Sequence, residues 1–180
     1  MAYSSRPAVS MSHPDRWLAF LRVVVGLYFA KAVITKLGVV MVGGVIPLPG
    51  ANERWINVMP TIVTKQASEN PILFYKHFLE NTVLAHGELF AHLTALGEAI
   101  AGVGLTLGLL SGAAALTGLV LVTNYGLATQ WMSPGQQGFH VVLVALMIAF
   151  FVSRSGRTWG LDARLWSDRP KSIFARRPFS

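Results

Sequence analysis

Apolar residues fill four long segments of the chain, and polar residues gather between the segments and at both ends. The segments lie at about residues 17–36, 84–110, 113–131 and 138–152. A helix that crosses a bilayer needs about 20 predominantly apolar residues, and a spanning segment must satisfy its own backbone hydrogen bonds. The last segment is shorter, so we expect Gln136, Gln137 and Ser153 to complete its ends. The pattern predicts an all-α fold, an integral membrane four-helix bundle formed by residues 17–153.

A different pattern fills residues 37–83, between the first two segments. Residues 38–50 are apolar but contain glycines and two prolines, so they either extend the first helix or fold back into the membrane interface. From residue 51 to 82, apolar side chains recur at helical spacing, as at Trp55, Ile56, Met59 and Val63 and again at Leu73, Phe74 and Phe78. Short amphipathic helices that lie on the membrane surface or cap the bundle fit this spacing.

The composition is that of a membrane protein, since 53% of the 180 residues are hydrophobic and only 13% are charged. The formal net charge of +7 would also suit a nucleic-acid partner. However, much of this charge follows an apolar segment, at Arg154, Arg157, Arg164, Arg169, Lys171, Arg176 and Arg177. Such placement follows the positive-inside rule of membrane proteins. We therefore expect a lipid bilayer, and no nucleic acid, as the partner of these basic residues.

The same rule predicts the orientation of the chain. The basic tail at residues 154–180 is expected in the cytoplasm. An even number of spans places the polar tail at residues 1–16 on the same side. The amphipathic loop at residues 37–83 is then external.

Glycines at the end of the second segment and just after it predict a close contact between helices. Gly104, Gly108 and Gly112 form two consecutive G-x-x-x-G steps. This spacing lets a second helix approach closely within a membrane.

The absence of cysteine limits the chemistry of this chain. It excludes disulfides, thiolate catalysis, and zinc or iron–sulfur sites held by cysteine in this chain. Redox chemistry would need a bound organic cofactor, a histidine-ligated metal or a partner. We predict no metal site, because Glu88 and His92 at i, i+4 supply only two ligands and His86 points to another face.

Ionisable residues inside the apolar segments mark the candidate site. At bilayer depth such groups are costly unless they face protein or water, so they are a functional-site hypothesis by default. Counted at about 1.5 Å per residue from the cytoplasmic end, Lys31, Glu98 and Asn124 share a layer near the bilayer centre. We expect Lys31 to be the partner of Glu98, with Asn124 as a neutral hydrogen-bond neighbour.

A second polar layer lies nearer to the external side. Lys36 and His92 match in depth, and Glu88 lies one helical turn higher. Two accounts of these layers remain open. They are either buried ion pairs that fix the register of the helices, or a polar pocket between the first three helices. Such a pocket would open outward and hold a small polar headgroup or relay protons.

Two stretches carry a resemblance to a known family. The first is R-W-L-A-F-L-R-V-V-V-G-L-Y-F, residues 16–29, in a helix that closes in Thr35-Lys36-Leu37. The second is G-E-x-x-x-G-x-x-L-x-L-G-L, from Gly97 to Leu109. Over residues 16–153 the chain resembles the DoxX/DoxD-like family of small four-helix bacterial membrane proteins.

The resemblance implies a bacterial plasma-membrane protein linked to redox metabolism. Some members of the family form the membrane subunit of a thiosulfate:quinone oxidoreductase, which passes electrons to quinone. Others accompany oxidative-stress or respiratory proteins. The resemblance therefore implies quinone, and a soluble or membrane redox subunit, as partners.

Two functional hypotheses follow. In the first, the chain is a redox-linked membrane subunit with a quinone site formed by Lys31, Lys36, Glu88, His92, Glu98 and Asn124. A lysine or histidine would donate hydrogen bonds to the quinone carbonyl oxygens, and Glu98 would exchange protons as the catalytic carboxyl group. In the second, the chain is a non-catalytic anchor or assembly subunit of a respiratory or oxidative-stress complex. A small transporter is a third class, but no inverted repeat supports it.

The predicted orientation has a direct test. Single cysteines introduced at Ser68 and Ser172 should react differently with a membrane-impermeant thiol reagent on intact cells. We expect labelling at position 68 and none at position 172, because the basic tail resists translocation. Labelling at position 172 in intact cells would overturn this topology.

Overall fold

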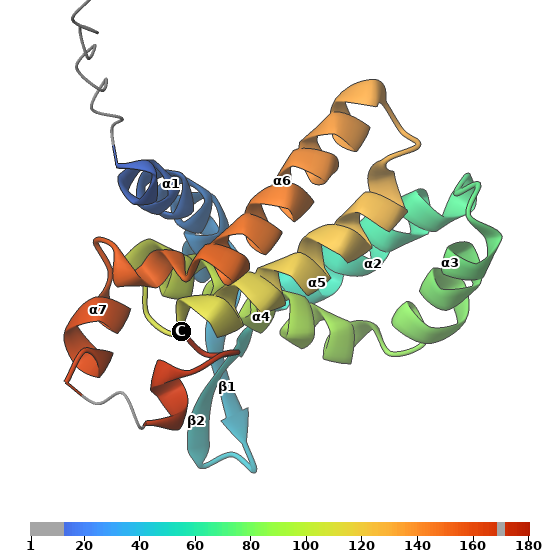
Figure 1. Cartoon of the computed structure of the whole chain (residues 1–180). Coiled ribbons are helices and arrows are strands. Elements are labelled where there is room, and N and C mark those ends of the chain that lie inside the picture. Colours follow the sequence, from blue (N-terminus) through green and yellow to red (C-terminus); the bar gives the residue numbers. More distant parts are fainter. Residues whose placement is uncertain (1–12, 169–171) are drawn as a thin grey trace, which may run out of the picture.

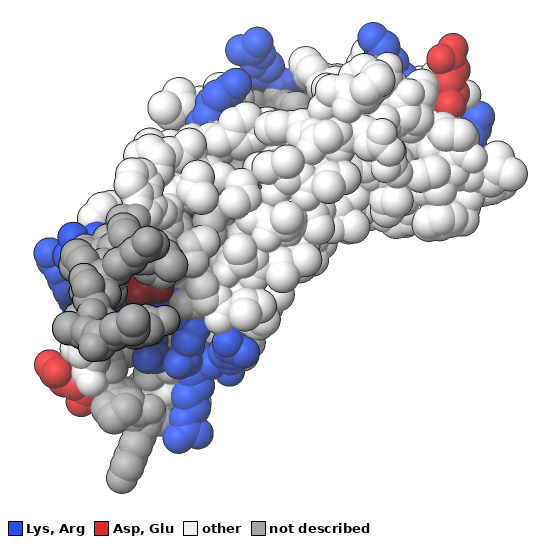
Figure 2. All heavy atoms as spheres, turned by 45° about the horizontal axis from the view of Figure 1, so that its top comes forward, with Lys and Arg blue, Asp and Glu red and all other residues white. Residues whose placement is uncertain are grey.

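Four long helices form the body of the molecule (Figure 1). The computed structural model describes residues 13–168 and 172–180. Helices α1 (Pro14–Thr35), α4 (Gly87–Leu107), α5 (Ser111–Thr129) and α6 (Pro134–Ser153) are each long and apolar enough to cross a membrane. The predicted all-α membrane bundle is confirmed. One face of the molecule carries a broad band without charged side chains, with charged groups toward its two ends (Figure 2).

The ends of these helices follow from local sequence signals. Ser133 caps α6 by accepting a hydrogen bond from the backbone N–H of Gln136, and Pro134 occupies the first turn. Helix α6 therefore starts four residues before the apolar segment and reaches 20 residues. At the other end of the bundle, Gly108 ends α4 in the left-handed conformation with φ of +62°.

Helices α1 and α4 pack most closely, at two glycines. A Cβ atom on Gly26 of α1 would collide with the backbone of Thr106, and one on Gly102 of α4 would collide with the backbone of Ala30. Small residues at such positions let two membrane helices approach closely. These contacts set the offset between α1 and α4, since they place Gly26 beside Thr106 and Ala30 beside Gly102.

The three glycines singled out from the sequence do not share one partner. Gly104 faces Ala114 of α5, Gly108 lies against the guanidinium of Arg22, and Gly112 lies against the carbonyl of Pro178. All three are sites of close approach. Because α4 ends at Leu107, Gly108 belongs to the turn and Gly112 to α5. The three glycines therefore do not face one second helix, as the G-x-x-x-G spacing predicted.

Residues 37–51 form a β-hairpin, where the sequence suggested either a longer first helix or a return into the interface. Strands β1 (Leu37–Val42) and β2 (Ile46–Ala51) pair antiparallel, with Val40 opposite Leu48. Gly43 and Gly44 supply the positive φ angles of the turn. The hairpin projects from the bundle (Figure 1).

The amphipathic segment caps the bundle, which is one of the two arrangements that the sequence left open. It consists of α2 (Glu53–Ser68), α3 (Leu73–Phe78) and the π-helical turn η1 (Leu79–Val83). Its buried face packs against α4 and α5 in one cluster that includes Met59, Val63, Tyr75, Leu79, Ala91, Ala95 and Ala128. A second cluster joins α1, α4, α5 and α6 around Phe29, Leu105, Val122, Met147 and Phe150.

The segment after α6 is part of the folded domain rather than a free basic tail. It contains η2 (Ser155–Arg157), α7 (Leu161–Trp166) and η3 (Ile173–Ala175). Arg22 is fully buried and donates to the carbonyl oxygens of Leu105 at 2.6 Å and of Thr158 and Trp159 at 3.3 Å. Of the tails expected from the sequence, residues 1–12 and 169–171 lie outside the described residues.

Asp162 fastens this segment to the turn between α4 and α5. Its carboxylate is 2% exposed and accepts hydrogen bonds from Leu110 N, Ser111 N and Ser111 Oγ at 2.7–2.9 Å. A carboxylate at this place satisfies backbone donors of the first turn of α5 and interacts favourably with the helix dipole.

Asp162→Ala should therefore destabilise the protein. Each buried donor left without a partner costs about 1–3 kcal/mol, so the midpoint of thermal unfolding in detergent should fall clearly. Asp168→Ala is the matched control, because Asp168 is exposed on the same segment. Equal unfolding midpoints for the two variants would contradict a fastening role for Asp162.

Candidate functional site

The segment formed by α2, α3 and η1 is called the cap below. A cavity of about 690 Å³ lies between the cap and the helix pair α4–α5. We call it the main cavity. Its walls are largely apolar and come from α2, α3, η1, α4 and α5. Polar groups are few, and they include Lys36, Gln66, Thr94, Glu98, Asn124 and Tyr125. An apolar cleft with a few convergent polar groups is the usual form of a small-molecule site.

An ion pair between Lys36 and Glu98 forms the charged part of the main cavity. Lys36 Nζ lies 2.7 Å from Glu98 Oε2, and the two side chains are 20% and 11% exposed. The Lys36 ammonium also lies 3.9 Å from the centre of the Trp55 ring, in a cation–π contact. Each charge is thus held by a partner in a place that water reaches poorly.

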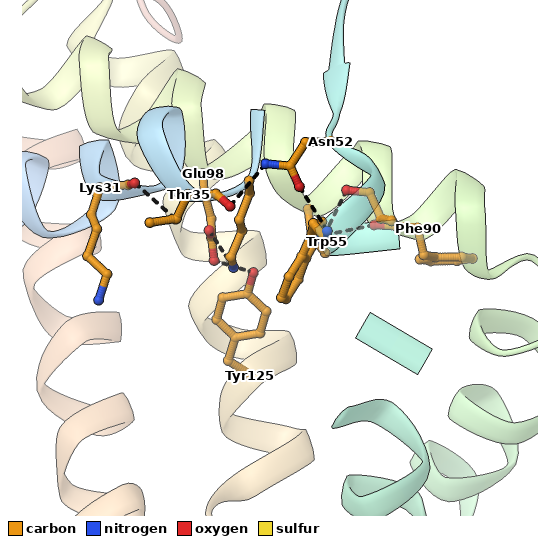
Figure 3. Close-up of polar contacts among 10 residues, drawn as sticks. Lys31, Thr35, Asn52, Trp55, Phe90, Glu98 and Tyr125 are labelled. Carbon is orange, nitrogen blue, oxygen red and sulfur yellow. Dashed lines mark hydrogen bonds and ion pairs between the residues drawn. The ribbon is translucent and has the colours of Figure 1, made fainter. Parts of the chain in front are cut away.

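Tyr125 provides a hydrogen-bond donor for the second carboxylate oxygen of Glu98. Its hydroxyl donates to Glu98 Oε1 at 2.7 Å, so both carboxylate oxygens have a partner (Figure 3). The phenol comes from α5, the carboxylate from α4 and the ammonium from the end of α1. The cluster therefore joins three of the four long helices.

Asn52 positions both Lys36 and Trp55. Its backbone N–H donates to Lys36 O at 2.7 Å, and its side-chain amide donates to Thr35 O at 3.1 Å. Its Oδ1 accepts from Trp55 N at 2.8 Å and thereby caps α2. The Trp55 ring is fixed in turn by a bond from Nε1 to Thr94 Oγ1 at 3.1 Å. One residue thus ties the end of α1 to the start of α2 (Figure 3).

Asn124 lines the main cavity but does not bond to Glu98. Its Oδ1 and its backbone oxygen accept from the hydroxyl of Tyr75 at 3.2 Å and 2.9 Å, and its Nδ2 donates to Val120 O at 2.7 Å. Burial raises the pKa of Tyr75 to about 12, so its hydroxyl stays a donor at neutral pH. Asn124 therefore anchors α3 to α5 beside the cavity.

The expected pairing of Lys31 with Glu98 is wrong. Lys31 is exposed, and its amino group points away from Glu98 (Figure 3). The depth count treated α1 and α4 as level, but Ala30 lies beside Gly102. Lys31 therefore falls about 4.5 Å short of Glu98 along the helix, and the later Lys36 takes its place.

Glu88 and His92 lie outside the main cavity and support the hairpin. His92 Nδ1 accepts from the backbone N–H of Ala51 at 2.8 Å, where Gly50 lets the ring approach closely. His92 Nε2 lies 3.8 Å from Glu88 Oε1, and the Glu88 side chain is 75% exposed. These contacts fix the base of β2 on α4.

Sequence reasoning missed Tyr125, Trp55 and Tyr75. Tyr125 directly follows Asn124 and, unlike Asn124, bonds to Glu98. Because this contact joins α5 to α4, the spacing within one segment does not indicate it. Trp55 and Tyr75 come from the segment between the spans. The amphipathic pattern showed that this segment covers something apolar, but not that it covers a cavity.

Within the described residues, no group of three His, Asp or Glu side chains is placed to hold a metal ion. The polar groups of the main cavity offer hydrogen bonding and proton exchange. Lys36 can donate to an oxygen atom of a ligand, and Glu98 can hold or release a proton.

Comparison with known proteins gives a family match over most of the chain. The family described as DoxD, the TQO small subunit, matches residues 17–172. No curated protein and no solved structure is similar enough to this chain to give a match.

The ion pair predicts a coupling that can be measured. Lys36→Met and Glu98→Gln should each lower stability, and the double variant should lose less than the sum of the two. Residues in direct contact commonly couple by about 0.5–3 kcal/mol. Thermal unfolding of the four proteins in one detergent gives the coupling.

Lys31→Met is the matched control in the same cycle. It removes a lysine from the same helix but from an exposed position, so it should not couple to Glu98→Gln. Coupling of Glu98 to Lys31 in place of Lys36 would contradict this geometry.

Proposed function

The chain belongs to the DoxD family, and from this membership and the chemistry of the main cavity we propose that it binds quinone as the membrane subunit of a thiosulfate:quinone oxidoreductase. In this role the chain presents the quinone ring for reduction. The observation that carries the proposal is the ion pair of Lys36 and Glu98 at the edge of an apolar cavity.

The size and lining of the main cavity suit a quinone ring. Its volume of about 690 Å³ lies within the range of about 300–1,000 Å³ that small-molecule sites occupy. Aromatic and aliphatic side chains, including Trp55, Phe78 and Phe90, would stack on or surround the ring. Leu93 and Val120 line the same cavity and are 52% and 62% exposed, so a lipid-soluble molecule would enter from the bilayer.

The polar groups suit the two oxygen atoms of the ring. Lys36 has three N–H donors, one of which serves Glu98, and another can donate to a quinone carbonyl. Charge-assisted bonds of this kind are roughly twice as strong as neutral ones. Conversion of quinone to quinol takes up two electrons and two protons, and Glu98 is placed to hand over the protons.

The electrons must come from the sulfur donor. Two thiosulfate ions that join through one new S–S bond release two electrons, which matches the need of one quinone. This chain contains no cysteine that could bind sulfur covalently. We therefore propose that a partner subunit oxidises thiosulfate and passes the electrons to quinone held in the main cavity.

The proposed setting is the bacterial plasma membrane, with both termini in the cytoplasm and residues 37–83 external. Arg154, Arg157, Arg176 and Arg177 follow the last spanning helix, and this supports the orientation. Lys36 lies at the opposite end of α1 from Pro14. The charged side of the cavity would then belong to the external half of the membrane.

The proposal is tested by quinone binding to the purified protein. We expect co-purifying quinone in lipid nanodiscs, and quenching of tryptophan fluorescence by added decylubiquinone, because Trp55 lines the cavity. Lys36→Met should weaken binding about tenfold or more, since a bond to a charged donor contributes about 1.5–3 kcal/mol.

Lys31→Met is again the control and should bind as the wild type does, since Lys31 is exposed and outside the cavity. Absence of quinone binding by the folded wild-type protein would overturn the proposal. That result would favour the alternative of a non-catalytic anchor, in which the ion pair only fixes the helices.

A further inference from the structure

A second cavity lies beside the main one. Its volume is about 450 Å³, and it is lined by residues of α1, α2, α5, α6 and the turn before α6. Gln66 and Tyr125 line both cavities. The second cavity therefore meets the candidate quinone site at the residue that bonds to Glu98.

The lining of the second cavity suits water better than an anion. It offers neutral hydrogen-bonding groups, among them Tyr28, Thr129, Ser133, Gln136 and His140. Among the residues that the structure describes, neither lysine nor arginine lines it. A water molecule takes up about 30 Å³ in the liquid, so the space admits several waters held by these groups.

His140 is the ionisable group of α6 in this cavity, and it is 8% exposed. Its Nδ1 lies 2.7 Å from the carbonyl oxygen of Gln136. Because a carbonyl oxygen only accepts, Nδ1 carries a hydrogen, and Nε2 of the neutral ring is left as an acceptor. The ring can therefore take up a proton at Nε2 and release it again.

Close packing brings His140 of α6 against Gly126 of α5, and His140 and Tyr125 line the same cavity. Gly126, the residue after Tyr125, lies against the side chain of His140, and a Cβ atom at this position would lie only 3.3 Å from the Cβ of His140. The absence of a side chain at Gly126 allows α6 to approach α5 here. Tyr125 then spans the distance from the second cavity to Glu98, to which its hydroxyl donates at 2.7 Å.

We propose that the second cavity is the route by which protons reach the quinone site, from His140 through the hydroxyl of Tyr125 to Glu98. The inference rests on the proposed function and adds to it the source of the protons. Glu98 needs such a route, because its side chain is 11% exposed and both its oxygens are engaged. Its charged or titratable neighbours include Lys36 at the end of α1, Tyr125 of α5 and, through an electrostatic interaction, Tyr28 of α1.

His140 Nε2 first takes up a proton from the aqueous phase and gives it to a water molecule in the second cavity. That water gives a proton to the oxygen of Tyr125 as the Tyr125 hydroxyl proton moves to Glu98 Oε1, and the Glu98 carboxylate becomes a carboxyl group. Glu98 then gives this proton to the reduced oxygen of the substrate and is again the carboxylate that pairs with Lys36. Two such cycles deliver two protons, and the two electrons come from thiosulfate through the proposed partner.

The first test asks whether water reaches His140. Diethyl pyrocarbonate modifies imidazole nitrogens that are open to solvent, and mass spectrometry reports each histidine separately. We expect modification of His140 in the native protein, although its ring is nearly buried, and of the exposed His86 as a positive control. Modification of His140 only after unfolding would overturn the route.

The second test measures proton delivery in native membranes, with thiosulfate as donor and decylubiquinone as acceptor. His140→Ala should slow quinol formation about tenfold or more while quinone binding stays unchanged. Added imidazole should restore the rate, because it fits the space left by the side chain and carries protons in its place. Tyr125→Phe should slow the reaction too, with a larger solvent deuterium isotope effect than in the wild type.

His86→Ala is the matched control and should keep the wild-type rate, because His86 is exposed and outside both cavities. Unchanged rates in both His140→Ala and Tyr125→Phe, with quinone bound and Glu98→Gln inactive, would overturn the proton route alone. Failure of the wild type to bind quinone would instead overturn the proposed function, and this inference with it.

Discussion

The ion pair between Lys36 and Glu98 is the constraint on which the rest of the site depends. A carboxylate within a membrane helix is costly unless it is paired or neutralised, and removing one partner of a buried pair leaves the other uncompensated. Glu98 therefore requires a cation at the level where α1 ends, and Tyr125 satisfies its other oxygen. Together, Lys36, Glu98 and Tyr125 hold α1, α4 and α5 in register.

The same cluster lies where the segment between the first two spanning helices is attached to the bundle. Asn52 bonds to the end of α1 and caps α2, so the cap starts beside the ion pair and continues over α4 and α5. The cap packs against α4 and α5 through one apolar cluster, and residues of this cluster also line the main cavity. A cavity with exposed apolar side chains in its lining and one charged edge suits a lipid-soluble, oxygen-bearing substrate, and this supports the proposed function.

The four long helices could be predicted from the sequence, because a spanning segment must satisfy its own backbone hydrogen bonds and therefore forms one long apolar run. The start of α6 was missed, since Pro134 serves both a turn and a first helical turn. The sequence placed Lys36 and Glu98 in the candidate site, but it paired Glu98 with Lys31, and this pairing is wrong. Depth counting takes helices as level, whereas Gly26 and Gly102 set the true offset. Tyr125 and Glu98 are 27 residues apart in the sequence, so no hydrophobic periodicity along the chain indicates their contact.

Photoaffinity labelling with an azidoquinone tests the central claim most directly, that quinone occupies the main cavity. Peptide mapping after illumination of the protein in nanodiscs should find adducts on α2, such as at Trp55 or Met59, and on the facing part of α4 or α5. Excess decylubiquinone should prevent these adducts. Adducts confined to the outer faces of α1 and α6, or labelling that excess quinone does not reduce, would contradict the account.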